Sequence, residues 1–374
     1  MKAYKFKLYE NRRNRYLKRS INASGSIYNH CIALHKRYYS MFKKHLNKYQ
    51  LMKHIAKLRR KNSYWQLVGS QAVQNICDRI QKAYELFFKY NKQGVRPPSF
   101  RKVKKYKSFT LKQAGYKILG SNKIKIGKII YKFHLSREVK GKVKTVTIKR
   151  SAVGEMYLII VTDFKKESFG VVTGKSGGFD FGLKCFLTDS NGIEYKSPLF
   201  MLKAYKLIRA ANKKLSSKRK GSNNWHKARI ELAKLHEHIA NQRKDYFWKL
   251  AHQLCDTYDY LFFEDLNLKG MVKLWGRKVH DLAFSTFLDI LKLVAEKKGK
   301  FVGFVNRWYP SSKTCNSCGH IHKNLQLEDR RWRCSGCLQI NDRDKNAALN
   351  IHQEGMSSCG LGDVSQDFGS AIAV

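Results

Sequence analysis

Cys315-Asn-Ser-Cys318 and Cys334-Ser-Gly-Cys337 are two cysteine pairs fifteen residues apart, and they lead into the acidic segment Asn341-Asp-Arg-Asp-Lys-Asn-Ala-Ala348. Each C-x-x-C places two thiolates on one tight turn, and two such turns at this spacing complete a tetrahedral four-sulfur zinc site. Because the protein supplies all four ligands, this zinc is structural and leaves no position open for water. We expect the metal to hold the carboxylates just downstream in a fixed place.

Two other interpretations of the cysteine region stay open at this point. A redox-active C-x-x-C is the first, although it would not need a second copy. His320 and His322 lie beside the pairs and compete as ligands, but ordinary surface histidines are the simpler reading.

The composition points to a polyanionic partner. Lys and Arg outnumber Asp and Glu by 75 to 27 in 374 residues, which gives a formal charge of +48. A lone compact fold with this charge would repel itself, and an aromatic content of 13% adds surfaces on which bases stack. The alternatives are a ribosomal-type or a membrane-surface protein, which are usually shorter and do not need the carboxylate pattern described below.

Cysteine usage and the first residues indicate a reducing compartment. Outside the two pairs, five scattered cysteines read as buried free thiols: Cys31, Cys77, Cys185, Cys255 and Cys359. The segment that begins Met1-Lys-Ala-Tyr-Lys has no apolar core of a signal peptide, and no run approaches the length of a membrane span. We therefore expect no membrane partner and a bacterial cytosol or nucleoid location.

The first half of the chain divides at a pair of prolines. Residues 3–9 alternate as a strand does, and residues 11–90 carry helical apolar spacing. The pattern breaks at Pro97 and Pro98, after which residues 100–165 form short, basic, strand-like runs typical of a small barrel or sandwich.

A second boundary is predicted between residues 165 and 176. Beyond it we expect a hairpin with its turn at residues 189–192, two helices separated at residues 220–223, a buried strand at 260–265, a helix at about 279–298 and a strand at 301–305. Asp344 opens a final helix, and the segment after Gly355 reads as a flexible tail.

Three acids stand where an α/β domain with a mixed sheet would bring them together. Asp180 lies on a first strand, Glu264 ends a later apolar strand, and Asp344 starts a helix with a small apolar face. Three carboxylates in one water-poor site repel each other and need divalent cations, for which Mg²⁺ is suited. A pair of such ions activates water and stabilises the leaving oxygen of a phosphodiester. Taken singly, each acid has a structural alternative: Asp180 as a turn residue, Glu264 beside a helix start, and Asp342 or Asp344 as a helix cap.

The motifs in combination resemble the TnpB family, the transposon-encoded RNA-guided nucleases that are related to type V CRISPR effectors. The matching segments are Met1-Lys-Ala-Tyr-Lys-Phe6, Gly178-Phe-Asp-Phe-Gly-Leu183, Glu264-Asp-Leu-Asn-Leu-Lys-Gly-Met271, Trp308-Tyr-Pro-Ser-Ser-Lys-Thr-Cys-Asn-Ser-Cys-Gly319 and Asp342-Arg-Asp-Lys-Asn-Ala-Ala-Leu-Asn-Ile351. The resemblance covers most of residues 175–351 and the N-terminus. Phe179 replaces the more usual Ile before the first acid, and it is still apolar.

The resemblance implies an α/β, RNase H-like (RuvC-type) nuclease domain whose metal-binding triad is Asp180, Glu264 and Asp344, the last being preferred over Asp342. It also implies a β-barrel (WED-like) domain interrupted by a helical recognition domain. With the boundaries above, the chain divides into the first barrel strand at 1–10, the helical recognition domain at 11–93, the rest of the barrel at 94–168, the nuclease domain at 169–312, the zinc ribbon at 313–339, the final nuclease-domain helix at 340–353 and the flexible C-terminal tail at 354–374.

The implied activity is RNA-guided, Mg²⁺-dependent cleavage of double-stranded DNA beside a short transposon-adjacent motif, with two Mg²⁺ ions, a structural Zn²⁺ and a guide RNA from the transposon end, in a monomeric ribonucleoprotein. In such systems base pairing reads the sequence while the protein reads shape and phosphates. The basic side chains expected to contact phosphates are Arg59, Arg60, Lys61, Arg101, Lys102, Lys104, Lys105 and Lys107. Arg243 and Lys244 lie on a helix face that is either solvated or lines a nucleic-acid strand. Two alternative functions are an RNA-guided repressor that does not cut and a DNA-joining transposase that needs no RNA.

Overall fold

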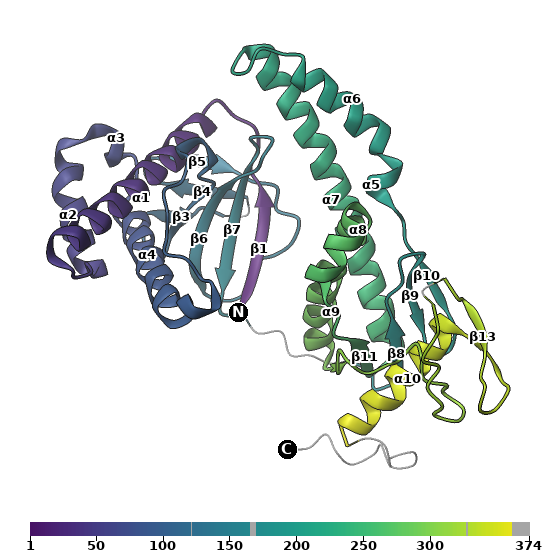
Figure 1. The fold of residues 1–374 in the computed structure, drawn as a ribbon. Coiled ribbons are helices and arrows are strands. Elements are labelled where there is room, and N and C mark those ends of the chain that lie inside the picture. The colour runs from purple at the N-terminus through teal and green to yellow at the C-terminus, as the bar shows by residue number, and fades with distance from the viewer. Residues whose placement is uncertain (121, 165–169, 327, 361–374) are drawn as a thin grey trace. The chain divides into compact units, whose positions relative to one another are not determined.

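The computed structural model describes residues 1–120, 122–164, 170–326 and 328–360, and the chain forms two compact units, Met1–Lys165 and Lys166–Val374 (Figure 1). This division lies at the start of the predicted boundary segment. The predicted domain border between residues 168 and 169 itself falls outside the described residues. No helix in the described part of the chain combines the length and the apolar character needed to cross a bilayer.

The strands of unit 1 form two antiparallel sheets. One has the order β1-β7-β6-β2 and the other β3-β4-β5. Their bounds are β1 Lys2–Lys7, β2 Ser108–Leu111, β3 Tyr116–Ile118, β4 Lys123–Ile126, β5 Ile129–Lys132, β6 Val143–Arg150 and β7 Met156–Thr162. Strand β1 confirms the predicted alternation, because Tyr4 and Phe6 are buried while Lys5 and Lys7 are exposed. It pairs with β7, and a bridge from Leu8 to Phe133 links it to the chain just after β5.

Helices fill the segment between β1 and β2, as the apolar spacing predicts. Their bounds are α1 Asn14–Phe42, α2 Lys48–Lys61, α3 Ser63–Gln66 and α4 Ser70–Tyr90, followed by the short turns η1 Asn91–Gln93 and η2 Val103–Lys105. Asn47 and Gln50 form a capping box at the start of α2, which satisfies two backbone N–H groups. The apolar stripes of α1 and α4 join the buried face of the β1 sheet in one core.

Unit 2 is built on a five-stranded mixed sheet of order β10-β9-β8-β11-β12. Strands β8 and β9 are antiparallel, whereas β8, β11 and β12 run parallel. The bounds are β8 Ser176–Asp180, β9 Cys185–Asp189, β10 Glu194–Lys196, α5 Phe200–Lys203, α6 Tyr205–Ser216, α7 Asn223–Thr257, β11 Tyr260–Glu264, α8 Leu268–Leu282, α9 Phe284–Lys298, β12 Phe301–Val305, β13 Arg331–Arg333, β14 Ile340–Asp342 and α10 Arg343–Ser358. The predicted mixed sheet and the predicted turn between β9 and β10, with Gly192 at φ +84°, are confirmed.

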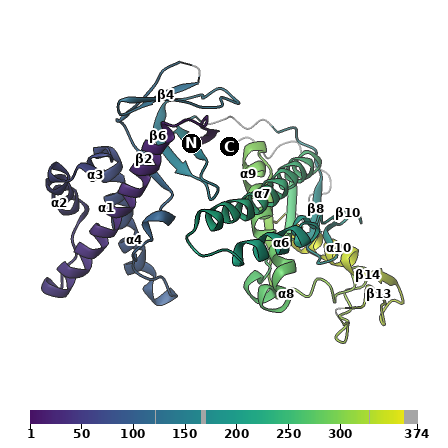
Figure 2. The ribbon, with the colours of Figure 1, turned by 90° about the horizontal axis from the view of Figure 1, so that it is seen from above.

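Helices cover both faces of this sheet (Figure 2). On one face α7 and α9 bury an aromatic core that includes Phe179, Phe263 and Phe287. On the other face α10 packs so closely that a Cβ at Gly178 would lie 2.2 Å from the carbonyl oxygen of Ala348. A glycine at this position therefore allows the helix to reach the strand.

Two predicted element boundaries are wrong. The helix expected at about 279–298 is divided, because Ala283 adopts a left-handed conformation (φ +48°) that ends α8 and starts α9. The predicted start of the flexible tail at residue 354 is too early. Helix α10 continues to Ser358, and Gly355 packs against the ring of Phe262. Residues 361–374 of that predicted tail lie outside the described residues.

Candidate active site and metal centre

The ends of two neighbouring parallel strands carry the first two acids. Asp180 is the last residue of β8, and Glu264 is the last residue of β11. Phe179 pairs with Phe263 in the parallel register, so the next residue on each strand brings Asp180 and Glu264 side by side. The carboxyl ends of parallel strands are where open α/β sheets form their sites.

Alternation along the strands decides which face these acids occupy. Gly178 and Phe262 lie against α10, whereas Phe179 and Phe263 belong to the core under α7 and α9. Because side chains alternate along a strand, the residues two positions after Gly178 and Phe262 share their face. Asp180 and Glu264 therefore lie on the α10 side, where Asp344 stands in the first turn of that helix.

The Asp180 carboxyl group responds to the charges of the other two acids. Burial, together with the negative charges of Asp344 and Glu264, raises the pKa of Asp180 to about 7, against the opposing charges of Arg343 and Arg330. Burial also raises the pKa of Glu264, helped by the charge of Asp265. A carboxyl group held among like charges ionises with difficulty unless a cation joins it, so the donor set fits a divalent cation.

Asp344 and Asp342 have different roles at the start of α10. The Asp342 side chain caps the helix by accepting a hydrogen bond from the Lys345 N–H at 3.1 Å. Asp344 instead accepts two hydrogen bonds from Nη1 of Arg330, at 2.8 and 3.1 Å. Asp342 is therefore engaged as a helix cap, and the choice of Asp344 as the third site acid stays a prediction. Arg330 gave no signal in the sequence, because the contact depends on how the cysteine region folds back.

The four cysteines form a compact ligand cluster. The sulfur atoms of Cys315, Cys318, Cys334 and Cys337 all lie within 4.8 Å of one another, and within the described residues this is the one group of three or more Cys, His, Asp or Glu found so close. Strands β13 and β14 pair beside it, and Trp332 and Leu325 form a small core with Cys315 and Cys334. His320 accepts or donates to the Ser335 hydroxyl at 2.9 Å, as expected of a non-ligand. Four sulfurs in this arrangement fit Zn²⁺.

The surroundings of Cys315 favour its thiolate form. Burial opposes ionisation, but the Asn341 amide and the backbone N–H groups of Ser317 and Cys318 outweigh it and lower the pKa of Cys315 to about 6. Asn341 donates to the sulfur at 3.5 Å. Thiolates are the form that binds zinc.

Two buried asparagines tie the cysteine region to the helix that carries Asp344. The Asn346 amide donates to the carbonyl of Thr314 at 2.7 Å and accepts from the Asn316 N–H at 2.9 Å. The Asn350 amide, one helical turn later, donates to the carbonyls of Ser311 and Thr314, both at 2.7 Å. The first cysteine turn is therefore fixed directly onto α10, as the sequence predicts in outline.

The basic residues expected to contact nucleic acid differ in their environments. Most of them are exposed in unit 1: Arg60, Lys61, Arg101, Lys102, Lys104, Lys105 and Lys107. Arg59 is only half-exposed, and its Nε donates to the Trp65 carbonyl at 3.4 Å. In unit 2, Lys244 is exposed, but Arg243 points inward and binds Asp281 at 3.0 Å. The contact with Asp281, which also accepts from the N–H groups of Met201 and Leu202, corrects the expectation for Arg243 and favours a structural role.

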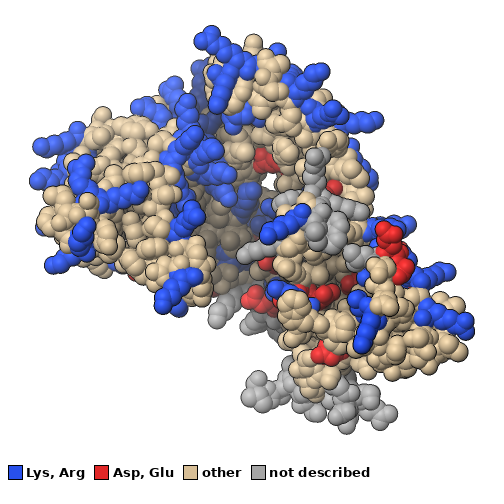
Figure 3. All heavy atoms as spheres, in the orientation of Figure 1, with Lys and Arg blue, Asp and Glu red and all other residues tan. Residues whose placement is uncertain are grey.

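The turn between α6 and α7 carries a group of exposed basic side chains, here called the basic tip. The sequence predicted this segment only as a break between two helices. Its exposed cations are Lys213, Lys214, Lys218, Arg219 and Lys220. Figure 3 shows Lys and Arg across the visible face of unit 1 and, separately, at this tip of unit 2. The run Lys218-Arg-Lys220 in the sequence is the pattern that indicates this basic surface.

Two segments of the chain match known family models. Residues 163–274 match OrfB_IS605, described as "Probable transposase", and residues 284–351 match "Cas12f1-like, TNB domain". The first segment contains Asp180 and Glu264, and the second contains the four cysteines and Asp344.

Curated relatives and a solved structure are also similar to the chain. A "Putative RNA-guided DNA endonuclease" of Streptomyces pristinaespiralis is 30% identical over 59% of this chain and 54% of its own length, so the chain spans about half of that relative. InsQ of Escherichia coli K12, which carries the same description, is 28% identical over 79% of this chain and 77% of its own length. A cryo-EM structure of a Cas12f1-sgRNA-target DNA complex matches with a TM-score of 0.59 at 16% identity, over 91% of this chain and 83% of that one.

Fold and site thus define an α/β protein with the fold of Cas12f1 and a four-cysteine cluster. The family models and the curated relatives confirm the resemblance to the TnpB proteins of insertion sequences.

Proposed function

We propose that this protein is an RNA-guided, Mg²⁺-dependent DNA endonuclease encoded by an insertion sequence, with Asp180, Glu264 and Asp344 as its metal-binding triad in an RNase H-like (RuvC-type) domain. The observation that supports this most is that Asp180 and Glu264 end neighbouring parallel strands and that the charges of Asp344 and Glu264 help to raise the pKa of Asp180. The ligand atoms of the three acids do not all lie within 4.8 Å of one another, so we expect them to draw together when a cation binds. Relatives named as RNA-guided DNA endonucleases supply the substrate class.

The chain's own residues prepare this site for cations. Asp180 and Glu264 are held by the strand ends, so their carboxylates are placed before any ligand arrives. Asp344 is held by Arg330, and we expect this ion pair to open when a cation takes the Asp344 carboxylate. When bound, two Mg²⁺ ions supply Lewis-acid stabilisation of the phosphodiester and activation of water.

The zinc site has a positioning task in this proposal. The cysteine cluster is fixed to α10 through Asn346 and Asn350, and Arg330, which precedes Cys334 in the chain, pairs with Asp344. A structural Zn²⁺ therefore stabilises the helix start that carries the third acid.

The proposed partners are a guide RNA from the transposon end and double-stranded target DNA beside a short motif, in a monomeric ribonucleoprotein of the bacterial cytosol. The net charge of +48 and the exposed cations of unit 1 support a permanently bound RNA. The division into a β-barrel with an inserted helical recognition domain belongs to the same proposal.

The test is cleavage of target DNA by the purified ribonucleoprotein in Mg²⁺. We expect Asp180→Ala to abolish cleavage while RNA still co-purifies, with Asp342→Asn, which keeps a helix-capping oxygen, as the matched control that retains cleavage. Full cleavage by Asp180→Ala would overturn the triad.

The same preparation separates the two alternatives. A wild-type complex that binds target DNA without cutting it is the behaviour of a repressor. A protein that purifies without RNA and joins DNA ends is the behaviour of a transposase.

A further inference from the structure

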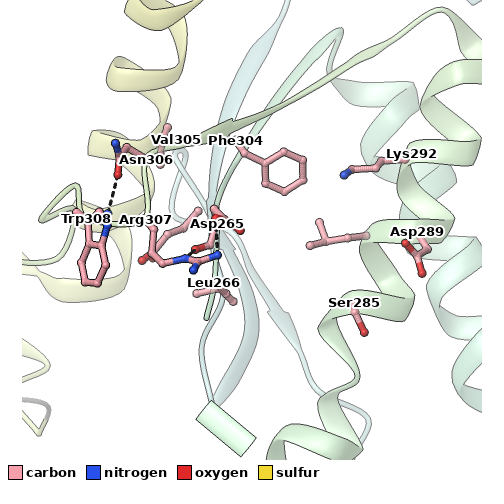
Figure 4. A pocket seen from close by; sticks show the side chains of 12 residues that line it. Asp265, Leu266, Ser285, Asp289, Lys292, Phe304, Val305, Asn306, Arg307 and Trp308 are labelled. Atoms are coloured by element: carbon pink, nitrogen blue, oxygen red, sulfur yellow. Dashed lines mark hydrogen bonds and ion pairs between the residues drawn. The ribbon is translucent and has the colours of Figure 1, made fainter. Parts of the chain in front are cut away.

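A groove of about 790 Å³ opens beside Glu264, along the ends of β11 and β12 and one face of α9 (Figure 4). Its lining residues are Glu264, Asp265, Leu266, Ser285, Leu288, Asp289, Lys292, Phe304, Val305, Asn306, Arg307 and Trp308. Of these, the proposed triad uses only Glu264. A groove of this volume has the size of a small-molecule site, which suits a short unpaired segment of nucleic acid and not a duplex.

The aromatic side chains of the groove are unusually accessible. Trp308 is 86% exposed and Phe304 is 38% exposed, although large apolar side chains normally gain free energy from burial. Exposed apolar side chains that share one concave wall, as Trp308 and Phe304 do, are typical of a binding surface.

The loop that carries Trp308 is held in place. The Asn306 carboxamide oxygen accepts a hydrogen bond from the Trp308 N–H at 2.9 Å, which turns the chain just after β12. Arg307 then donates from Nε to the Asp265 carbonyl at 3.0 Å and from Nη2 to its carboxylate at 2.6 Å. The exposed indole is thus carried by a loop that is braced against the end of β11, and Figure 4 shows the contacts Asn306–Trp308 and Arg307–Asp265.

The opposite wall supplies a cation. Lys292 on α9 places its ammonium 4.3 Å from the centroid of the Phe304 ring, so the charge stays at the groove. Asp289 and Ser285 lie on the same helix face, one and two turns earlier. Since Arg307 is paired with Asp265, Lys292 is the cation of the lining set without an ion pair among the described residues.

We infer that this groove binds an unpaired segment of the DNA strand to be cut, with Trp308 as a stacking platform for one base and Lys292 as a contact to the adjoining phosphate. The inference rests on the proposed function, because Glu264 sets the place of the cut. An accessible aromatic face combined with a cation is the usual means of holding single-stranded nucleic acid without reading its sequence. Trp308 and Lys292 are positioning residues that act on the strand next to the reacting phosphate.

The experiment uses the full-length ribonucleoprotein and short single-stranded DNA substrates in which one nucleotide at a time is abasic. In the wild type, we expect one abasic position near the cut to weaken binding or slow cleavage about fivefold or more. In Trp308→Ala, cleavage of the intact strand falls by a similar factor, and the same abasic position has no further effect. Trp308→Phe keeps most of the wild-type behaviour.

Binding is measured separately in an Asp180→Ala background by anisotropy of a labelled strand, which gives a readout that does not need cleavage. Lys292→Gln is compared there with Lys297→Gln. Both lysines lie on α9 over an aromatic ring, but only Lys292 lines the groove, since Lys297 covers Trp248. We expect weaker binding for Lys292→Gln alone.

Two failures are distinguishable. If the wild type cuts DNA but Trp308→Ala gives the same rate and the same abasic profile, the groove inference is wrong and the proposed function stands. If the wild type does not cut DNA and Trp308→Ala leaves the binding of the labelled strand unchanged, the proposed function and the groove inference are both wrong.

Discussion

Asp180, a residue of the proposed triad, carries a cost in folding stability. It lies at a strand end among like charges, and burial and two neighbouring carboxylates raise its pKa to about 7. Ionising such a group in the folded state costs free energy that the unfolded chain does not bear. Active sites commonly hold groups of this kind, because the same repulsion favours cation binding.

At the residue scale, we predict that Asp180→Asn stabilises the metal-free protein at pH 8 by on the order of 1 kcal/mol. The raised pKa means that the wild type loses stability as pH rises from the ordinary aspartate value of about 4 toward 7, so the advantage of the variant shrinks in acid. Mg²⁺ should raise the melting temperature of the wild type and leave that of the variant nearly unchanged. Thermal unfolding with and without Mg²⁺ checks this, and equal Mg²⁺ stabilisation of both proteins would contradict it.

His35 is a second residue whose protonation is linked to folding. It is 3% exposed on α1, lies tilted against Tyr84 at 4.7 Å between ring centroids, and neither ring nitrogen has a hydrogen-bond partner among the described residues. Burial, with a smaller effect of His45, lowers its pKa to about 4.

A lowered histidine pKa means that the folded state disfavours the proton. The stability linked to His35 is therefore fully present above pH 6.5 and is lost as pH falls toward 4. We predict that wild type loses about 2 kcal/mol from this source between pH 7.5 and pH 5, and that His35→Leu removes that part of the pH dependence. Denaturant unfolding at the two pH values measures it, with the exposed His134→Leu as a control whose pH dependence stays that of wild type. If the free energy of unfolding of His35→Leu depends on pH as that of the wild type does, His35 is not the group responsible for the loss of stability in acid.

At the scale of elements, α10 joins three features that lie apart in the sequence. Its first turn carries Asp344, its middle packs on Gly178 of β8, and its asparagines hold the first cysteine turn. Asn346 and Asn350 are 3% and 2% exposed, so their own amide groups have little access to water as an alternative partner.

We predict that Asn350→Leu lowers the free energy of unfolding of unit 2 by about 2–3 kcal/mol, because it leaves the Ser311 and Thr314 carbonyls with one hydrogen bond fewer each. Zinc should also leave the variant faster in the presence of a chelator. Gln353→Ala is the matched control: Gln353 lies on the same helix and is exposed, and it only accepts a 3.3 Å hydrogen bond from Asn316. Equal zinc-release rates in the two variants would contradict the idea that Asn350 holds the first cysteine turn in place.

At the scale of the whole molecule, the excess of positive charge sets how the protein meets nucleic acid. Exposed cations gather between η1 and β2 of unit 1, in the segment that includes Lys102, Lys104 and Lys105, and they bear no ion pair within the described residues. Each phosphate contact that a lysine makes releases counterions, so affinity falls steeply with salt.

We predict that replacing Lys102, Lys104 and Lys105 together by Gln weakens RNA binding and reduces the slope of log affinity against log salt by about 2. Arg243→Gln should instead lower the melting temperature and leave the salt slope as it is, because Arg243 is paired with Asp281. Binding titrations at several salt concentrations test both variants. A reduced slope of log affinity against log salt in Arg243→Gln would show that Arg243 does contact the nucleic acid.

The sequence by itself determined the features that depend on short-range patterns: the alternation of β1, the turn at Gly192, the cysteine spacing and the placing of Asp180 and Glu264 at strand ends. Periodicity and ligand spacing act over a few residues, so they can be recognised without the fold.

Only the tertiary structure decided that Arg243 faces Asp281, that Arg330 holds Asp344, and that Trp308 and Lys292 share a groove. The break at Ala283 belongs here too, since no residue type in the sequence marks that left-handed position. Such features depend on which side chains the packing of the sheet and helices brings together, and neither an ion-pair partner nor a concave wall has a local pattern that specifies it.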